Sequence, residues 1–322
     1  GHAVYASDTS FVTLTNSGTE VARLQLTHSN PVMKNNENRF LTYGIGSSSY
    51  EISSFDETLY SGNAENKIYT GDVASNGTYC LVTEDNGYLT TLYAYSKNNN
   101  RIYKYSFSEY YITSVAINKD GSGCVATGVS SDKGSAVTGV YVLDFSQEKP
   151  VSTYKISGDS VLDCKYLTSD TAVLVGSQAS YIVKKGEKNY KTVSYEDKTL
   201  SNYCFNTDTS TYTMALSRSG DGRSVALISY NSNGEAQYTI NTEHKADSLS
   251  VYKGTVAILD GNVVYGYNQK GDLLYSTNSG TGSKKIVLAS DYTAYILSVN
   301  QIRFIDLDSV SSDDTAQTSK QE

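Results

Sequence analysis

One stretch of the chain, beginning at Ile112, has the pattern of a small antiparallel sheet. Its first segment alternates apolar with small or polar residues, as a half-buried strand does. The sequence Lys-Asp-Gly-Ser-Gly at 119–123 is typical of a turn, because Asp bonds its own backbone there and Gly accepts a positive φ. The strands predicted in this stretch are 112–118, 124–128, 140–145 and 151–156. Four short antiparallel strands in about 45 residues are the size of one β-propeller blade.

The same unit recurs along the whole chain. The second strand of each unit aligns on one apolar position, at intervals of 37 to 48 residues: Val4, Leu41, Leu81, Val125, Val173, Met214, Ala257 and Tyr295. Third strands are also predicted eight times, within 10–16, 50–55, 91–96, 139–145, 180–185, 225–231, 263–268 and 301–307. Repeats of this length, each too small to bury its own faces, indicate a β-propeller of four-stranded antiparallel blades.

The two ends of the chain hold incomplete units. No strand precedes His2-Ala3-Val4, and no fourth strand follows Leu307. The pattern therefore allows two arrangements: eight blades with short terminal ones, or seven blades in which the terminal units merge. We favour eight, because each end carries its own second and third strand.

Composition agrees with an all-β protein organised as one domain. The chain has 29 Tyr and only 2 Pro, and no segment keeps a helical period. We expect a single propeller domain at 1–308, since stacked blades share one ring. The polar residues 309–322 are predicted to form a disordered C-terminal tail.

Charge and hydropathy exclude two classes of partner. The net charge of −8 makes a nucleic-acid partner unfavourable. No apolar run approaches the roughly 18 residues that a membrane-spanning helix needs. We expect no nucleic-acid partner and a monomeric protein.

The four cysteines follow the period of the blades: Cys80, Cys124, Cys164 and Cys204 are spaced by 44, 40 and 40 residues. A cysteine at the blade period is best explained as a small core residue. No CxxC pair indicates zinc, and equivalent positions in adjacent blades are expected to be too far apart for a disulfide. The sequence therefore predicts buried, reduced thiols and no metal site.

No catalytic constellation is present in the sequence. The three histidines, His2, His28 and His244, are interpreted as exposed loop residues. There is no GxSxG, phosphate-binding loop or HExxH, and residues 219–223 have turn chemistry rather than a calcium loop. We predict no catalytic residue and no cofactor, and we favour a non-enzymatic protein.

A ligand is expected at the face of the propeller where loops surround the mouth of the channel. The loops 84–88, 130–135 and 218–223 are long or charged, and binding residues concentrate on such loops. First-strand side chains that face the channel are further candidates. The candidate ligand-binding residues are Asp72, Glu84, Asp85, Asp132, Lys133, Asp163, Lys165, Arg218, Asp221 and Arg223.

The segment INKDGSGCVATG resembles the strand-turn-strand of WD40-like and quinoprotein-like propellers. Leu143-Asp144 and Ile305-Asp306 stand where a WD40 blade carries Trp-Asp, although the chain has no Trp. Over residues 2–307 the pattern is similar to an uncharacterised, extracytoplasmic propeller family of Gram-positive bacteria. This resemblance implies a location at the cell surface or secretion, and contact with a membrane only through an anchor preceding residue 1.

Two functions are compatible with these features. The first is a non-enzymatic scaffold that binds a ligand or protein of the cell envelope. The second is a glycan-binding module or glycan-active enzyme that uses Tyr and the loop carboxylates Asp85, Asp132 and Asp221. We favour the first, because glycoside hydrolysis needs two carboxyl groups at a defined separation that the sequence does not show.

Overall fold

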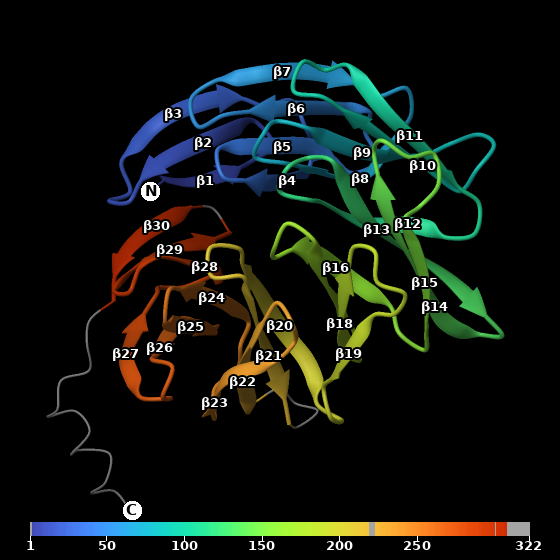
Figure 1. Ribbon diagram of the computed structural model, residues 1–322. Coiled ribbons are helices and arrows are strands. Elements are labelled where there is room, and N and C mark those ends of the chain that lie inside the picture. Colours follow the sequence, from blue (N-terminus) through green and yellow to red (C-terminus); the bar gives the residue numbers. More distant parts are fainter. Residues whose placement is uncertain (1, 219–222, 300, 308–322) are drawn as a thin grey trace, which may run out of the picture. The chain divides into compact units, whose positions relative to one another are not determined.

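The computed structural model describes residues 2–218, 223–299 and 301–307, and every regular element in these ranges is a β-strand. The strands form eight antiparallel sheets in chain order, and the fold is an eight-bladed β-propeller (Figure 1). We number the sheets as blades 1 to 8. The described ranges hold no helix that is long and apolar enough to cross a membrane.

Blades 1 to 5 belong to one compact unit, which consists of His2–Thr15 and Thr19–Ser194. We call it the five-blade unit. Blade 1 consists of β1 (His2–Ala6), β2 (Ser10–Thr15) and β3 (Glu20–Gln25); blade 2 of β4 (Pro31–Asn36), β5 (Arg39–Gly44), β6 (Ser49–Ser53) and β7 (Thr58–Asn63); blade 3 of β8 (Ile68–Val73), β9 (Tyr79–Thr83), β10 (Thr90–Tyr95) and β11 (Arg101–Phe107); blade 4 of β12 (Tyr111–Ile117), β13 (Gly123–Asp132), β14 (Ser135–Asp144) and β15 (Ser152–Ser157); and blade 5 of β16 (Val161–Tyr166), β17 (Thr171–Gly176), β18 (Ala179–Lys184) and β19 (Lys191–Ser194).

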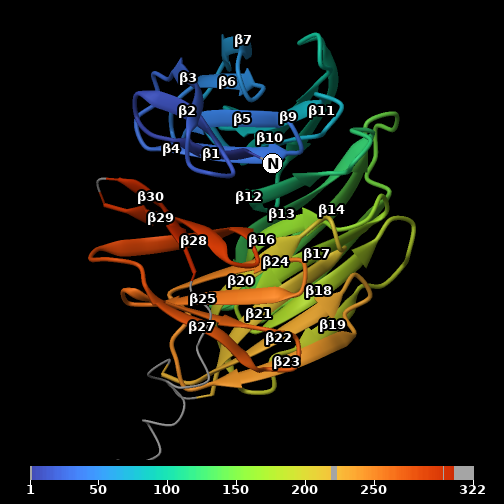
Figure 2. The ribbon, with the colours of Figure 1, turned by 90° about the vertical axis from the view of Figure 1, so that its left-hand side faces the viewer.

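Blades 6 to 8 belong to a second compact unit, the three-blade unit, which consists of Asn16–Gly18 and the chain from Tyr195 onward. Its sheets are coloured from yellow to red in Figure 2. Blade 6 consists of β20 (Thr199–Asn206), β21 (Thr211–Ser217), β22 (Val225–Asn231) and β23 (Ala236–Thr242); blade 7 of β24 (Ser248–Tyr252), β25 (Thr255–Asp260), β26 (Val263–Tyr267) and β27 (Leu273–Asn278); and blade 8 of β28 (Ser283–Ser290), β29 (Thr293–Ser298) and β30 (Ile302–Asp306).

The terminal sheets decide between the two arrangements that the sequence allowed. Strands β1–β2–β3 and β28–β29–β30 form separate three-stranded sheets. Eight blades are therefore confirmed, and the merged seven-blade arrangement is wrong. The predicted polar tail lies outside the described residues.

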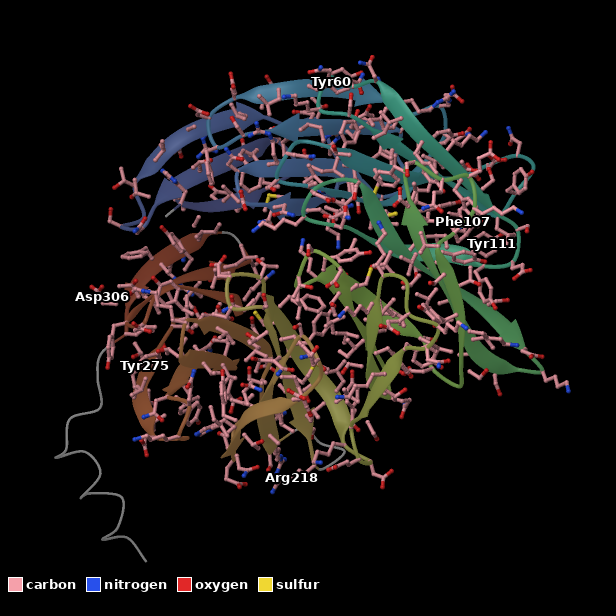
Figure 3. All side chains as sticks on the ribbon, in the orientation of Figure 1. Tyr60, Phe107, Tyr111, Arg218, Tyr275 and Asp306 are labelled. Carbon is pink, nitrogen blue, oxygen red and sulfur yellow. The ribbon has the colours of Figure 1, made fainter. Side chains whose placement is uncertain are left out.

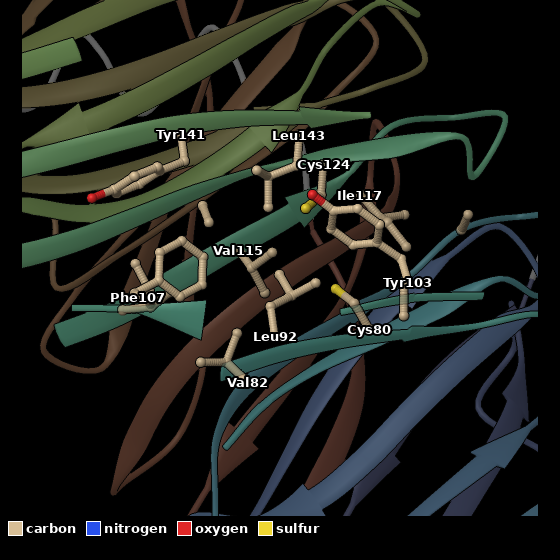
Figure 4. Packing of buried hydrophobic residues seen from close by; sticks show 14 residues of the cluster. Cys80, Val82, Leu92, Tyr103, Phe107, Val115, Ile117, Cys124, Tyr141 and Leu143 are labelled. Atoms are coloured by element: carbon tan, nitrogen blue, oxygen red, sulfur yellow. The ribbon is translucent and has the colours of Figure 1, made fainter. Parts of the chain in front are cut away.

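Alternate residues of the central strands face opposite neighbours. In β13, Cys124 packs in the apolar layer between blades 3 and 4, whereas Val125 packs in the layer between blades 4 and 5. In β14, Leu143 and Val142 divide in the same way. Figure 4 shows the first of these layers, in which Cys80 of blade 3 and Cys124 of blade 4 both take part. Blade 4 is thus buried on both faces, as its small and β-branched central strands predict.

The prediction of a polar loop at 130–135 is wrong. Strand β13 continues to Asp132 and pairs with β14 as far as Asp132 opposite Ser135. Only Lys133 and Gly134 form the turn, and both have positive φ, at 50° and 84°. This is the geometry of a tight two-residue hairpin, so the polar side chains decorate an exposed two-stranded arm rather than a loop. The sequence did not reveal it because Ser and Asp are typical of loops as well as of solvated strands.

Two carboxylates fix blade 5 to blade 4. Asp159, buried in the connection between these blades, accepts hydrogen bonds from the amide nitrogens of Ser177, Gln178 and Ala179 and from the hydroxyl of Tyr181. Its own carbonyl oxygen accepts a bond from the hydroxyl of Thr138 in blade 4. A buried charge is tolerated when its lone pairs are satisfied in this way.

The second carboxylate is Asp144, at the end of β14. Its Oδ2 lies 2.8 Å from Nζ of Lys185, next to blade 5, and its Oδ1 accepts bonds from Ser146. The bond from Lys185 and then those from Ser146 lower the pKa of Asp144 to about 2. The carboxylate therefore stays ionised at neutral pH and keeps both contacts.

The inter-blade layer predicts a large difference between two substitutions in one strand. Val142 is 1% exposed between blades 4 and 5, whereas Ala136 is exposed near the tip of the arm. Val142→Asp places an unpaired charge in the layer and is expected to lower the free energy of unfolding by about 3 kcal/mol or more. Ala136→Asp is expected to change it by no more than about 0.5 kcal/mol. Urea denaturation measures both, and equal effects would contradict the packing described.

Candidate functional site

The loops of the five-blade unit gather at one end of its sheets. Because all strands within a blade are antiparallel, the turn from the second to the third strand and the connection to the next blade lie at the same end. We call this end the loop face. The first strands β4, β8, β12 and β16 neighbour one another in that order, so their starting residues line the loop face side by side.

β-Bulges occur at the same position in three successive first strands. The extra, unpaired residues are Tyr69 in β8, Thr113 in β12 and Leu162 in β16. A bulge bends the strand and re-aims a side chain, and bulges are frequent next to functional sites. Thr113 and Leu162 are exposed, and Tyr69 is half-buried.

Large apolar side chains are exposed around these bulges. Ile45, Tyr88, Tyr111 and Leu162 are each more than half exposed, and they come from blades 2, 3, 4 and 5. The turn that holds Ile45 is bonded to β8, because Gly46 donates to the carbonyl oxygen of Ile68. An exposed apolar surface spread over adjacent blades is typical of an interaction site.

The predicted residues Glu84 and Asp85 lie at this surface, but they differ in what they can do. Asp85 accepts hydrogen bonds from the amides of Gly87 and Tyr88 and from the hydroxyl of Thr91, and these bonds lower its pKa. Its carboxylate therefore shapes the turn. Glu84 lies close enough to Tyr69 for its charge, after burial, to raise the pKa of that phenol.

Asp72, Asp163 and Lys165 are brought together deeper along the first strands. Oδ2 of Asp72 accepts the amide of Ile117 at 2.9 Å, which ties β8 to β12. Nζ of Lys165 donates to the carbonyl oxygen of Asn35 at 3.2 Å, which ties β16 to β4.

Sequence reasoning missed the partners of these residues. Oδ1 of Asp163 lies 3.7 Å from Nζ of Lys34 and 3.3 Å from the hydroxyl of Ser114. Burial alone would lower the pKa of Lys34, but Asp163 and then Asp72 outweigh it and raise the pKa. Lys34 therefore stays charged, and the cluster is an internally paired network that holds the first strands together. Aligning the first strands by offset could have found Ser114, which follows a bulge equivalent to the one before Asp163.

The remaining predicted residues are dispersed. Asp132 and Lys133 lie at the tip of the arm, where Asp132 pairs with Nζ of Lys155 at 3.1 Å. Arg218 and Arg223 are exposed residues of the three-blade unit, and Arg218 donates to Asn241. Asp221 lies outside the described residues. The structure thus gives no support to a pair of catalytic loop carboxylates.

The thiols are mostly buried, as predicted, and none is paired in a disulfide. Burial raises the pKa of Cys164 to about 12 and raises those of Cys80 and Cys124 as well. Cys204 is an exception to the prediction, because it is only half-buried. Within the described ranges, no group of three or more His, Cys, Asp or Glu side chains is arranged to hold a metal ion.

A model of the family of unknown function DUF5711 matches residues 1–307. The chain belongs to this family. None of the curated proteins compared matches the DUF5711 chain.

Solved structures similar to the DUF5711 chain include WD40 propellers. The C-terminal WD40 domain of Sif2 has a TM-score of 0.60 at 16% identity, over 87% of this chain and 80% of that one. Sqt1 of Chaetomium thermophilum, solved bound to the N-terminus of ribosomal protein L10, has a TM-score of 0.59 at 10% identity, over 95% of this chain and 92% of that one. A functionally unknown protein from Desulfotomaculum acetoxidans DSM 771 has a TM-score of 0.57 at 11% identity, over 96% of this chain and 100% of that one. At these identities the likeness shows a WD40-like propeller fold.

The prediction of an exposed His28 is wrong. The side chain is buried in the connection from blade 1 to blade 2, where Nδ1 lies 3.0 Å from the hydroxyl of Ser49. Nε2 lies 3.7 Å from the buried carboxylate of Glu51. Burial lowers the pKa of His28 and raises that of Glu51, so each group resists becoming charged. His244 is half-buried, stacked on Tyr265 and 3.5 Å from Asp260.

His28 predicts a pH dependence of stability. The pKa of His28 is lower in the folded than in the unfolded protein. Its contribution to the free energy of unfolding is therefore complete above the ordinary histidine pKa of about 6.5 and is lost as the pH falls below that value. Glu51 acts with the opposite sign, so the test compares variants. The gap in free energy of unfolding between the wild type and His28→Gln should narrow between pH 7.5 and pH 5.5 in urea titrations. A constant gap would contradict this account.

Proposed function

We propose that this protein is a non-enzymatic binding propeller that recognises a protein partner through the loop face of blades 2 to 5. The observation that carries the proposal is the exposed apolar surface of Ile45, Tyr88, Tyr111 and Leu162 around the three aligned bulges. Tyr residues are enriched in protein interfaces because they bury much area while keeping a polar hydroxyl.

Further support comes from the rigidity of what lies beneath this surface. The Asp72–Lys34–Asp163 network and the apolar layers hold the first strands in place. Side chains on a fixed scaffold lose little conformational freedom on binding. Sqt1, whose fold is similar, was solved bound to the N-terminus of ribosomal protein L10.

We further propose that the partner belongs to the cell envelope and that the protein acts outside the cytoplasm. This part rests on the similarity of residues 2–307 to extracytoplasmic propellers. Fractionation of the native cells, with antibody detection of the protein, tests the location separately from the binding.

Site-specific photocrosslinking tests the loop face. A photoreactive benzoylphenylalanine at position 88 or 111, irradiated in native cells, should give one discrete adduct with a protein. The matched control is position 102, because Ile102 is an exposed apolar residue on the outermost strand of blade 3. The adduct should be absent at position 102 and should be lost when the exposed Leu162→Asp change is added.

Two outcomes would contradict the proposal. Equal adducts at positions 88 and 102 would show that contact is not specific to the loop face. Adducts at position 88 that persist unchanged in the Leu162→Asp background would show that the apolar surface is not what the partner recognises.

A further inference from the structure

A cleft of about 490 Å³ lies between the outer strands of blades 3 and 4, beside the loop face. Its walls come from the end of β11, the connection at 108–110, and strands β14 and β15. A volume of this size falls in the range of small-ligand sites. Figure 3 labels Phe107, which marks the place where β11 enters this wall.

Three aromatic rings lie around the ring of Tyr141 at the wall of the cleft. The ring of Tyr141 lies 5.0 Å from that of Phe107, 6.1 Å from that of Tyr105 and 6.2 Å from that of Tyr110, between centroids. The Phe107 and Tyr141 rings meet edge to face at 74° (Figure 4). Phe107 and Tyr141 are buried in the layer between blades 3 and 4, whereas the half-buried rings of Tyr105 and Tyr110 are open to the cleft. A ring face that is open to a cleft can bind a cation.

The backbone of blade 4 fixes the position of the Tyr110 ring at the cleft. Gly128 of β13 and Gly139 of β14 are opposite each other in the sheet. A Cβ atom at Gly139 would lie 2.5 Å from the ring of Tyr110, and one at Gly128 would lie 2.9 Å from its Cβ. The ring of Tyr110 therefore lies against a bare stretch of backbone that only glycine provides.

Some tyrosine hydroxyls of the cleft have a hydrogen-bond partner within the protein, and others have none among the described residues. The hydroxyl of Tyr154, which also lines the cleft, donates to the carbonyl oxygen of Glu187. Within the described ranges, the hydroxyls of Tyr105, Tyr110 and Tyr141 have no such partner. They remain available to a ligand.

The charge of the cleft is negative. Lys155, its one described cation, is paired with Asp132 at 3.1 Å. The carboxylate of Glu109 has no ion pair among the described residues, and its charge is felt by Tyr105 and Tyr141, whose pKa values are raised by burial first and then by Glu109. The raised pKa of Tyr141, about 12, keeps this phenol neutral, so it presents its ring face and hydroxyl rather than a charge.

We infer that this cleft binds a cationic side chain, a lysine or arginine of a basic peptide segment. The stem of such a side chain lies against the half-buried rings of Tyr105 and Tyr110 while its charge meets the exposed carboxylate of Glu109. The net charge of −8 on the whole chain favours approach of a basic segment. The lining of the cleft includes none of the four apolar residues that carry the loop-face proposal, so the two sites can be tested separately.

The test is an NMR titration of the whole protein, labelled in its tyrosines, with the peptide acetyl-Gly-Lys-Gly-amide. Resonances of Tyr105 and Tyr110 should shift with the lysine peptide and not with the same peptide acetylated on its lysine, which lacks the charge. Glu109→Gln should weaken binding by about fivefold or more. The matched control is Glu57→Gln, an exposed carboxylate in the turn of blade 2 that changes the net charge equally.

A second pair of variants separates the ring from the hydroxyl. Tyr105→Phe keeps the ring and should bind within about twofold of the wild type, whereas Tyr105→Leu should bind about fivefold more weakly. Asp132→Asn frees the charge of Lys155 and should also weaken binding. Equal binding of the acetylated peptide, an equal effect of Glu57→Gln, or a response of these tyrosines to maltotriose but not to the lysine peptide would each overturn the inference. Because the probe is a defined peptide, failure here leaves the crosslinking result at the loop face unaffected.

Discussion

The structure depends on one constraint: a sheet of three or four short strands with two apolar faces must be covered on both of them. Residues of β13 and β14 divide alternately between the layers toward blade 3 and toward blade 5. The same alternation places Ala215 and Val256 between blades 6 and 7, and Ala257 and Ile296 between blades 7 and 8. Burial between neighbours, worth about 25 cal/mol per Å² of apolar surface, supplies what a blade alone lacks.

Neighbouring first strands need a different link, because they belong to different sheets. Side chains provide it: Asp72 accepts the amide of Ile117, and Ser248 and Ser250 accept the amides of Ile286 and Leu288. This requirement explains why charged first-strand residues that resemble ligand-binding groups in the sequence are occupied in holding the blades. We propose that binding falls to the groups that this scaffold does not use, at the bulged ends of the strands and in the cleft between blades 3 and 4.

The repeat predicted the architecture well, because hydrophobic alternation and turn residues are local signals. Seven of the eight aligned positions, from Leu41 to Tyr295, lie in the second strand of their blade, and Val4 lies in the first strand of the three-stranded blade 1. Val142 and Leu143 lie in inter-blade layers as expected. The burial of His28 and the pairing of Lys34 with Asp163 could not be predicted, since they join residues distant in sequence. The aromatic cleft could not be predicted for a related reason. The sequence has 29 tyrosines, and only the fold shows which of their hydroxyls lack a hydrogen-bond partner among the described residues.

Equilibrium unfolding of a shortened chain tests the mutual covering of blades most directly. A chain that ends at Gly158 loses blades 5 to 8, so Val140, Val142 and Ile156 lose the blade 5 residues that cover them. The account predicts a cooperative urea transition for the whole chain and none for the shortened one, with near-ultraviolet circular dichroism of the tyrosines as the readout. A shortened chain that unfolds cooperatively at the same midpoint as the whole protein would contradict it.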